Sequence, residues 1–561
     1  MPVVIATWIE VVAVSKLFRR MLMVAAMAVV AMLSFAITPG TARAAVTGAI
    51  TVGGNAATRY DAHQLFSATV VDGADADQKV ATDLTWASDT VRQAVLPVLH
   101  DAGLDSSAST AQEAAEWMNA DGHMTTALTA KLARAIVKAG AAPVALTAGT
   151  VAELPCGYWL IVADDTAIAQ GEAGTAPIMA LVGGSAVTVK PKAATPKVSK
   201  HVLEDSAAAW QKAADATVAD DLYWRLSATV PAGLTAYDAY TVQFVDTMSA
   251  GLDPSKVAAS MHVYVAAGAD GGFDAVSAGK DGRAGTEPAK GWTDITSQCA
   301  VSVEGSSFTV RTGDLIAALG GADAFAAGAR VVAVYDAPLA NGCNHGIAKG
   351  NPNEAYLRYP RSPFADQSGD AGFTRTPSDD ATAYTWGLNL IKRSSSDDKP
   401  LAGAKLRITD DRGRTLAADG TWTTDADACI VTDKDGRVEL NGVDAGVYTV
   451  EEIAAPKGYT AFEGKRTVTV TAEGLDVKQV AAAKPKVTVS VESPLRVDTA
   501  DAGTGSIELS VLNTPSKEAS RGFMPSTGDR TLVLVAALAA IGVAAIVVAL
   551  VIKRGGGRRE K

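Results

Sequence analysis

The sequence predicts a mainly β protein in which an α+β region is followed by tandem antiparallel β-sandwiches and, near the C-terminus, an apolar helix. Alternating runs rich in Val, Thr and Tyr are typical of half-buried strands, and turn residues such as Gly, Asp and Asn separate them at sandwich spacing. About 480 of the 561 residues lie between the two apolar ends, which suggests three domains at about 150 residues each.

Residues 1–44 have the features of a secretory signal peptide. Positively charged residues precede an apolar run from Met21 to Ile37, and small residues follow as far as Ala44. The run is shorter than the roughly 20 apolar residues that span a bilayer. We therefore predict export and cleavage near Ala44.

Residues 45–194 are predicted to form the N-terminal α+β domain. Strand-like runs at 45–52 and 64–71 precede an Ala-rich stretch, Asp89 to Lys138, whose apolar residues recur at helical spacing. A further strand is expected at Tyr158–Val162. The helical face is explained by core packing and indicates no cofactor.

Residues 195–375 and 384–514 are each predicted to form a β-sandwich. The second sandwich opens at Gly387–Lys392 and closes at Ser506–Asn513, and the polar segment Asp366–Ala383 is expected to link the two. The strands expected in the first sandwich are Leu222–Val230, Tyr240–Val245, His262–Ala266, Phe308–Arg311, Arg330–Tyr335 and Ala355–Tyr359.

The C-terminal end combines three features in a fixed order. A stalk at 515–530 contains the pentapeptide Met524–Gly528 (MPSTG), an apolar segment follows at 531–552, and a basic tail occupies 553–561. At ~1.5 Å of rise per residue, this segment is long enough to cross a ~30 Å hydrocarbon core as a transmembrane helix. The basic tail is expected in the cytoplasm and the rest of the chain outside.

The pentapeptide closely resembles the LPxTG sorting signal of Gram-positive cell-wall proteins, with Met524 where the family usually has Leu. This resemblance implies that a sortase cysteine attacks the carbonyl of Thr527, releases Gly528 and passes the acyl group to an amine. The Met-for-Leu exchange conserves volume and is expected to affect efficiency more than recognition. The protein is therefore expected to be anchored to the cell wall after transient insertion into the membrane.

Composition excludes several classes of function. The net charge is −11 without a basic patch, which argues against a nucleic-acid partner. The motifs of common hydrolases and of phosphate-binding loops are missing from the sequence, so we expect neither a turnover enzyme nor a cofactor. The four cysteines contain no C-x-x-C pair, so no metal site is expected. In an exported chain, Cys299 and Cys343 are candidates for a disulfide, and free thiols are the alternative.

The segment Tyr448–Tyr459 (YTVEEIAAPKGY) is the most specific interior motif. It closely resembles the E-box of CnaB-type domains in Gram-positive pilins and adhesins, which have an Ig-like or Cna-type sandwich. In that family, a first-strand lysine, a mid-domain acid and a last-strand asparagine form an intramolecular isopeptide bond. By position, the resemblance assigns these roles to Lys392, Glu452 and Asn513.

The middle domain contains the runs Pro196–Val202 (PKVSKHV), Val245–Leu252 (VDTMSAGL) and Gly350–Leu357 (GNPNEAYL). These three runs resemble the second domain of major fimbrial subunits. The resemblance assigns the amine to Lys200, the buried acid to Asp246 and the amide to Asn353, with Asn351 as the competing amide. An apolar core lowers the pKa of a lysine and raises that of a carboxyl, so a neutral amine can attack an amide that the protonated acid polarises. In both sandwiches, the lysine and the asparagine are expected on the first and last strands.

A lysine-containing motif lies between the first two domains, in the run Thr188–Pro196 (TVKPKAATP). It resembles the pilin motif, whose lysine accepts the acyl group from the sorting threonine of the next subunit. Lys192 is the candidate acceptor, and Lys190 is the second choice.

Together these resemblances identify the chain as similar to sortase-assembled, SpaA-like major pilins of actinobacterial type. They imply a shaft subunit of a wall-anchored pilus that serves adhesion. The implied partners are a class C sortase, a housekeeping sortase, further copies of the chain, peptidoglycan, accessory pilins and host surface ligands. A monomeric wall-anchored adhesin, or an accessory pilin at the tip or base, is the alternative.

Overall fold

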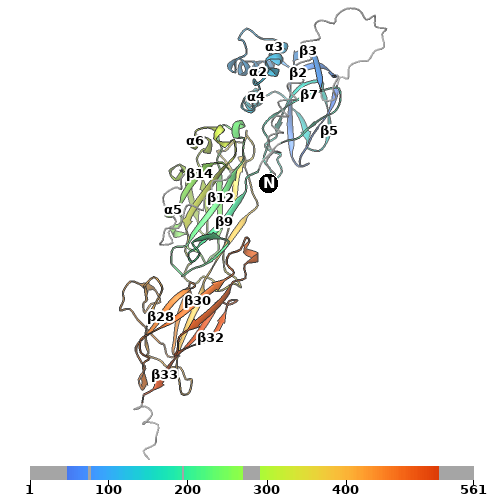
Figure 1. The fold of residues 1–561 in the computed structure, drawn as a ribbon. Helices are drawn as coiled ribbons and strands as arrows, with labels where there is room; N and C mark the ends of the chain where they lie inside the picture. The colour runs from blue at the N-terminus through green and yellow to red at the C-terminus, as the bar shows by residue number, and fades with distance from the viewer. Residues whose placement is uncertain (1–46, 74–77, 192–194, 269–290, 517–561) are drawn as a thin grey trace, which may run out of the picture.

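The computed structural model describes residues 47–73, 78–191, 195–268 and 291–516. Three regions follow one another along the long axis of the molecule, with β5 near one end and β33 at the other (Figure 1). The prediction of a mainly β protein with a helical insertion near its N-terminus is confirmed. Within the described ranges, no helix is both long and apolar enough to cross a membrane.

Several predicted features lie outside these described residues. They are the signal peptide at 1–44, the acceptor Lys192, the cleavage site at Thr527 and Gly528, the predicted transmembrane helix at 531–552 and the basic tail at 553–561.

The N-terminal region consists of two sheets and three helices. One sheet has the order β5-β1-β8, and the other has the order β3-β2-β6-β7 with β4 also paired to β2. The elements are β1 (Thr47–Val52), β2 (Arg59–Asp72), β3 (Lys79–Trp86), α2 (Asp89–Asp101), α3 (Ala111–Asn119), α4 (Thr126–Lys138), β4 (Val144–Thr147), β5 (Val151–Pro155), β6 (Gly157–Ala163), β7 (Ile178–Val182) and β8 (Val187–Val189).

Strand β6 is buried on both faces, which explains its continuous apolar sequence. Trp159 and Ile161 pack toward the three-stranded sheet, whereas Leu160 and Val162 pack against the helices. The helices begin at side-chain caps, and Thr110 and Glu113 form a reciprocal capping box at the start of α3. The Ala-rich stretch is therefore a helical layer on the larger sheet.

The middle region is a sandwich of two sheets with a large shared core. One sheet has the order β10-β9-β12-β18-β14-β15, and the facing sheet has the order β11-β21-β19-β13-β17-β16 with β20 paired to β19. The strands are β9 (Val198–Glu204), β10 (Ala209–Gln211), β11 (Ala213–Asp215), β12 (Tyr223–Val230), β13 (Gln243–Met248), β14 (His262–Ala267), β15 (Thr293–Asp294), β16 (Ala300–Glu304), β17 (Ser307–Arg311), β18 (Ala329–Asp336), β19 (Asn351–Pro360), β20 (Phe373–Arg375) and β21 (Asp379–Tyr384). The short helices α5 (Val257–Ser260) and α6 (Leu315–Ala318) contribute apolar residues to the shared core.

The C-terminal region is a second sandwich with its own core. Its sheets have the orders β27-β22-β33-β29, with β32 also paired to β33, and β25-β24-β23-β28-β30-β31, with β26 also paired to β23. The strands are β22 (Trp386–Ser394), β23 (Lys405–Thr409), β24 (Thr415–Leu416), β25 (Trp422–Thr423), β26 (Ile430–Val431), β27 (Arg437–Val443), β28 (Gly446–Ala454), β29 (Tyr459–Thr460), β30 (Lys465–Glu473), β31 (Lys486–Val491), β32 (Leu495–Asp501) and β33 (Ser506–Pro515).

The segment expected as a linker, Asp366–Ala383, belongs largely to the middle sandwich. Its residues form β20 and most of β21, and β21 pairs with both β19 and β11. The acidic pair Asp379–Asp380 explains why this segment is not a linker. The Asp379 carboxylate accepts hydrogen bonds from the Lys200 backbone amide and from the Lys212 ammonium. Only Thr385 separates β21 from β22, so the two sandwiches are joined almost directly.

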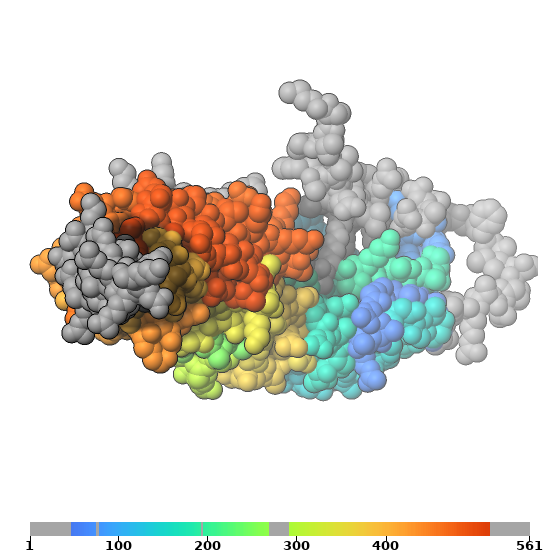
Figure 2. All heavy atoms as spheres, turned by 90° about the horizontal axis from the view of Figure 1, so that it is seen from below, coloured from blue at the N-terminus to red at the C-terminus, as the bar shows by residue number. Residues whose placement is uncertain are grey.

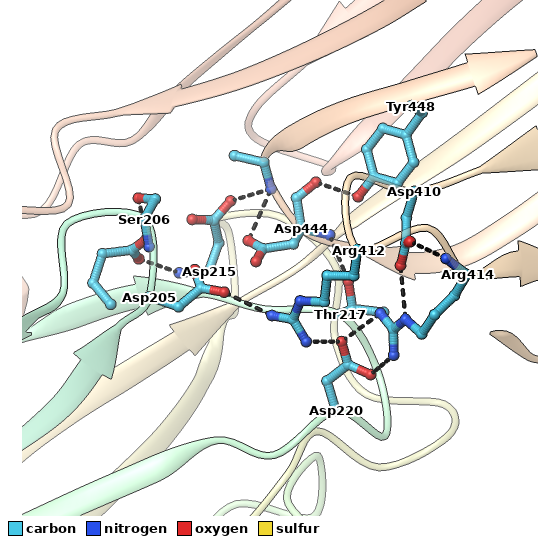
Figure 3. Close-up of polar contacts among 12 residues, drawn as sticks. Asp205, Ser206, Asp215, Thr217, Asp220, Asp410, Arg412, Arg414, Asp444 and Tyr448 are labelled. Atoms are coloured by element: carbon cyan, nitrogen blue, oxygen red, sulfur yellow. Dashed lines mark hydrogen bonds and ion pairs between the residues drawn. The ribbon is translucent and has the colours of Figure 1, made fainter. Parts of the chain in front are cut away.

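The two sandwiches contact each other through a polar junction. The Asp215 carboxylate accepts hydrogen bonds from the Trp386 indole at 2.6 Å and from the Ala445 backbone at 2.9 Å. The guanidinium groups of Arg412 and Arg414 both reach Asp220, at 2.9 Å and 2.8 Å (Figure 3). In the space-filling view, the orange C-terminal region and the yellow-green middle region form one continuous surface (Figure 2).

The expected disulfide between Cys299 and Cys343 does not form, because the two residues lie at opposite ends of β13. Cys299 directly precedes β16, at the level of the first residue of β13, and its thiol donates to the Ile295 carbonyl. Cys343 packs beside Gly251, beyond the last residue of β13. The length of β13 separates the two cysteines by more than about 15 Å, whereas a disulfide requires Cα atoms within about 7 Å of each other.

The junction also contains a carboxyl group that titrates near neutral pH. Burial, reinforced by the nearby Asp215 carboxylate, raises the pKa of Glu204 to about 7. A carboxyl with a raised pKa in the folded state favours folding below its unfolded pKa, and this contribution is lost as pH rises through the folded value. We therefore expect Glu204 to destabilise the folded chain progressively between about pH 4.5 and pH 7.

The Glu204→Gln variant tests this expectation, since a neutral amide removes the cost of ionisation. It should raise the melting temperature more at pH 8 than at pH 5, as measured by thermal unfolding of both proteins at both pH values. Glu304→Gln, at an exposed glutamate of the same sandwich, is the matched control and should show no such difference. An equal change at both pH values for Glu204→Gln would contradict the assignment.

Candidate functional site

The six residues assigned to the two trios all lie in sandwich cores. Lys200, Asp246, Asn353 and Lys392 are fully buried, Asn513 is 2% exposed and Glu452 is 7% exposed. Lysine and carboxylate side chains are rarely buried in this way unless they are paired. Each trio is therefore a cluster of buried polar side chains within an apolar core.

In the middle sandwich, the trio is drawn from both sheets. Lys200 lies on β9 of one sheet, whereas Asp246 on β13 and Asn353 on β19 belong to the facing sheet. The Lys200 ammonium donates a hydrogen bond to the Asp246 carboxylate and lies 5.4 Å from the centre of the Trp224 ring. The predicted lysine and acid are thus in direct contact across the core.

The structure separates the two competing asparagines of this trio. Asn351 points toward the Asn344 backbone, donating to its carbonyl at 2.9 Å and accepting from its amide at 3.0 Å. The Asn353 amide group instead donates to the Tyr335 hydroxyl at 3.0 Å, and that hydroxyl accepts a hydrogen bond from Lys200 at 2.7 Å. Asn353 is therefore the amide that faces the lysine.

One expectation about strand order is wrong for this sandwich. Asn353 lies on β19, which is followed by β20 and β21, so it is not on the last strand. The last strand, β21, contributes Asp379, whose carboxylate accepts from the backbone amide of Lys200 at 2.7 Å. The first strand is therefore held at Lys200 by contacts to two strands of the facing sheet.

In the C-terminal sandwich, the lysine and the asparagine lie on neighbouring strands of one sheet. Strands β22 and β33, the first and last of this sandwich, pair in parallel with Ser394 opposite Asn513. Glu452 reaches them from β28 of the facing sheet, with its Oε1 atom 3.0 Å from the Lys392 Nζ atom and 2.8 Å from the Asn513 Nδ2 atom. One carboxylate oxygen therefore contacts the side-chain nitrogens of both Lys392 and Asn513.

The electrostatics of both cores favour a neutral lysine. Burial lowers the pKa of Lys200 and of Lys392, and the paired carboxylates only partly oppose this effect. Burial likewise raises the pKa of Asp246, with the Lys200 ammonium acting in the opposite direction. The lysine in each trio is thus shifted toward the amine form, which is the nucleophilic form.

The amide oxygens of both asparagines are available to a donor. Among the described residues, the Oδ1 atoms of Asn353 and Asn513 are buried and have no hydrogen-bond partner, and the same holds for Asp246 Oδ1. A proton on the acid would let it donate to such an oxygen and polarise the amide carbonyl. Each trio therefore combines a nucleophile, a polarisable electrophile and an acid.

Sequence reasoning missed the contribution of Tyr335. The residue falls within a strand that was expected from its alternation, but nothing in the local sequence distinguishes it from an ordinary core aromatic. Its position opposite Trp224 on β12, beside Lys200 on β9, follows from the strand order of the sheet. The second acceptor candidate, Lys190, is exposed just after β8.

No curated protein matches the sequence. Solved structures similar to the chain include the T6 backbone pilin of serotype M6 Streptococcus pyogenes (15% identity, 84% of this chain and 98% of that chain covered, TM-score 0.46). Others are the full-length major pilin SpaD from Corynebacterium diphtheriae (14%, 84% and 97%, 0.41) and the major pilin subunit BcpA of Bacillus cereus (12%, 84% and 99%, 0.37).

A protein-family model matches residues 387–484, which begin within β22 and include the E-box with Glu452. The model describes the SpaA domain, a prealbumin-like fold domain. Residues 387–484 therefore match the SpaA domain, within the region 384–514 that was predicted from the E-box as a CnaB-type sandwich.

Proposed function

We propose that this chain is the shaft subunit of a sortase-assembled pilus on the surface of a Gram-positive bacterium, with an intramolecular isopeptide bond in each sandwich. The observation that carries the proposal is the arrangement of a buried lysine, acid and asparagine in two successive sandwiches. The SpaA match and the sorting signal at 524–528 support the same function. The protein acts on itself once and is otherwise a substrate of sortases.

The proposed chemistry is the same in both sandwiches. The neutral lysine amine attacks the Cγ atom of the asparagine, the acid stabilises the charge that develops on the amide oxygen, and ammonia leaves. The product is one amide bond between two side chains. In the C-terminal sandwich this bond would tie β22 to β33, and in the middle sandwich it would tie one sheet to the other.

The positions of the bonds suit a protein that bears tension. Pulling on the C-terminal stalk loads β33 first, and a bond from Asn513 to Lys392 would pass that load directly to β22. Strand β22 continues into β21 across Thr385 alone, so the load would enter the middle sandwich without crossing a flexible linker. The remaining strands of the C-terminal sandwich would then be protected from unfolding.

The number of bonds can be read from the intact mass of the exported part of the chain. Each bond releases one ammonia, so the wild-type mass should lie about 34 Da below the sequence mass, and Glu452→Ala should recover about 17 Da of that deficit. Glu451→Ala is the matched control, because this neighbouring side chain pairs with Arg407 on the opposite face of β28. A wild-type mass equal to the sequence mass would disprove the bonds.

Loss of one bond should also reduce stability. The loops closed by the two bonds exceed 100 residues, and in the chain-entropy model such a crosslink stabilises by about 5 kcal/mol. Asn353→Ala should therefore lower the denaturation midpoint of the middle sandwich and expose it to trypsin, as measured by denaturant unfolding and limited proteolysis. Asn344→Ala, at an asparagine outside the trio, should leave most of this resistance in place. Equal losses in the two variants would indicate that no crosslink contributes.

Polymerisation depends on the acceptor lysine. In wall extracts boiled in detergent, the wild-type strain should give a ladder of high-mass species on immunoblots, and Lys192→Ala should reduce it to a single band. Lys190→Ala should keep the ladder, and Thr527→Ala should abolish both the ladder and wall attachment. A single band in the wild type would instead support the monomeric adhesin.

A further inference from the structure

Tyr335 contacts the reacting groups of the middle sandwich more completely than the acid does. Its hydroxyl oxygen lies 2.7 Å from Lys200 Nζ, 2.9 Å from Asp246 Oδ2 and 3.0 Å from Asn353 Nδ2. The residue is fully buried on β18, and its ring packs edge-on against Phe308 with centroids 4.7 Å apart. The hydroxyl is therefore held at the centre of the trio.

The two trios differ in how far their acids reach. Glu452 contacts both Lys392 and Asn513 through a single oxygen. Asp246 is shorter by one methylene, and among the described residues its carboxylate bonds only Lys200 and Tyr335. In the middle sandwich, the link from the acid and the lysine to the asparagine nitrogen runs through the Tyr335 hydroxyl.

We propose that Tyr335 is a further catalytic residue of the middle sandwich, whose hydroxyl relays a proton from Lys200 Nζ to the departing nitrogen of Asn353. This inference rests on the proposed isopeptide bond. It assigns to a tyrosine the proton transfer that Glu452 can perform alone in the C-terminal sandwich.

The step balances in atoms and charge. The Lys200 amine forms a bond to Asn353 Cγ while the protonated Asp246 supports the negative amide oxygen. Nζ then gives one proton to the Tyr335 oxygen as Tyr335 gives its own proton to Nδ2, the Cγ–Nδ2 bond breaks and ammonia leaves. Asp246 and Tyr335 end in the protonation states in which they began, as catalysts must.

The surroundings of Tyr335 suit this role. Burial, together with the adjacent Asp246 carboxylate, raises its pKa well above the ordinary value, so the hydroxyl keeps its proton at neutral pH. In the structure the hydroxyl accepts from Lys200 Nζ and Asn353 Nδ2 and donates to Asp246 Oδ2. Once Lys200 has added to Cγ, Nδ2 is an amine nitrogen with a free lone pair, so it can accept the hydroxyl proton while the hydroxyl oxygen accepts from Nζ. In the C-terminal sandwich, the aromatic residue near Lys392 is Phe462, whose ring centre lies 5.1 Å from Nζ and which has no hydroxyl.

The test is the rate at which each crosslink forms in newly made full-length chain. Translation is stopped, samples are quenched in acid over time, and the Lys200–Asn353 and Lys392–Asn513 crosslinked peptides are quantified by mass spectrometry after digestion. In Tyr335→Phe, the first crosslink should form about 100-fold more slowly, the scale typical of a lost general acid–base group. The second crosslink should keep its wild-type rate and serves as the internal reference.

Tyr240→Phe is the matched control, because Tyr240 is a second fully buried tyrosine of the same core. It should crosslink at the wild-type rate. If Tyr335→Phe also crosslinks at the wild-type rate, the relay is wrong while the isopeptide proposal stands. If wild-type chain yields no Lys200–Asn353 peptide, the proposed bond itself fails.

Folding of Tyr335→Phe is checked by a cooperative thermal transition. If that variant does not fold, 3-fluorotyrosine introduced at position 335 alone keeps the ring and hydroxyl and changes the proton affinity of the oxygen. A changed rate for the first crosslink then supports the relay, and an unchanged rate overturns it.

Discussion

The burial of a lysine against a carboxylic acid inside each sandwich is the constraint on which the rest of the structure depends. Removing such ions from water costs several kcal/mol each, and the cost is recovered only with good geometry and further hydrogen bonds. Here the lysine pKa is lowered in both cores and the Asp246 pKa is raised, so proton transfer within the pair avoids part of that cost. Burial therefore has a high free-energy cost for the two ions and a lower one for a neutral amine beside a neutral acid.

The two sandwiches meet this constraint with different strand geometries. The C-terminal sandwich places lysine and asparagine on adjacent parallel strands, and a long acid reaches both from the facing sheet. The middle sandwich places the lysine on one sheet and the asparagine on the other, and its shorter acid bonds the lysine and a tyrosine. A bond in the first case would reinforce a sheet, and a bond in the second would hold two sheets together.

The contacts between regions make the described chain more than a string of separate domains. At the first boundary, Arg134 on α4 forms an ion pair with Asp238 at 2.9 Å, and the Tyr359 hydroxyl donates to the Gly171 carbonyl at 2.9 Å. At the second, Asp215 accepts from the Trp386 indole and from a backbone amide of the facing loop. Such contacts resist bending at the boundaries between the regions.

The sequence by itself determined the fold class, and its motifs predicted the residues that the structure brings together in the two trios. Strand alternation and turn residues depend on local chemistry, and the E-box fixes Glu452 by a dense local pattern. Strand boundaries differ from the predicted ones where side chains replace the backbone hydrogen bonds of the ladder. Strand β13 was expected to begin at Tyr240 but begins at Gln243, because Asp314 and Thr312 side chains accept from the backbone amides of Tyr240 and Val242.

Only the tertiary structure decided which groups face one another. The choice of Asn353 over Asn351 depends on the direction of two side chains from one strand, and their contacts lie on other strands. The separation of Cys299 from Cys343 along β13, and the inclusion of 373–384 in the middle sandwich, follow from strand pairing between distant segments. Tyr335 joins the trio for the same reason: proximity across a sandwich core is set by the packing of two sheets, which no local sequence pattern records.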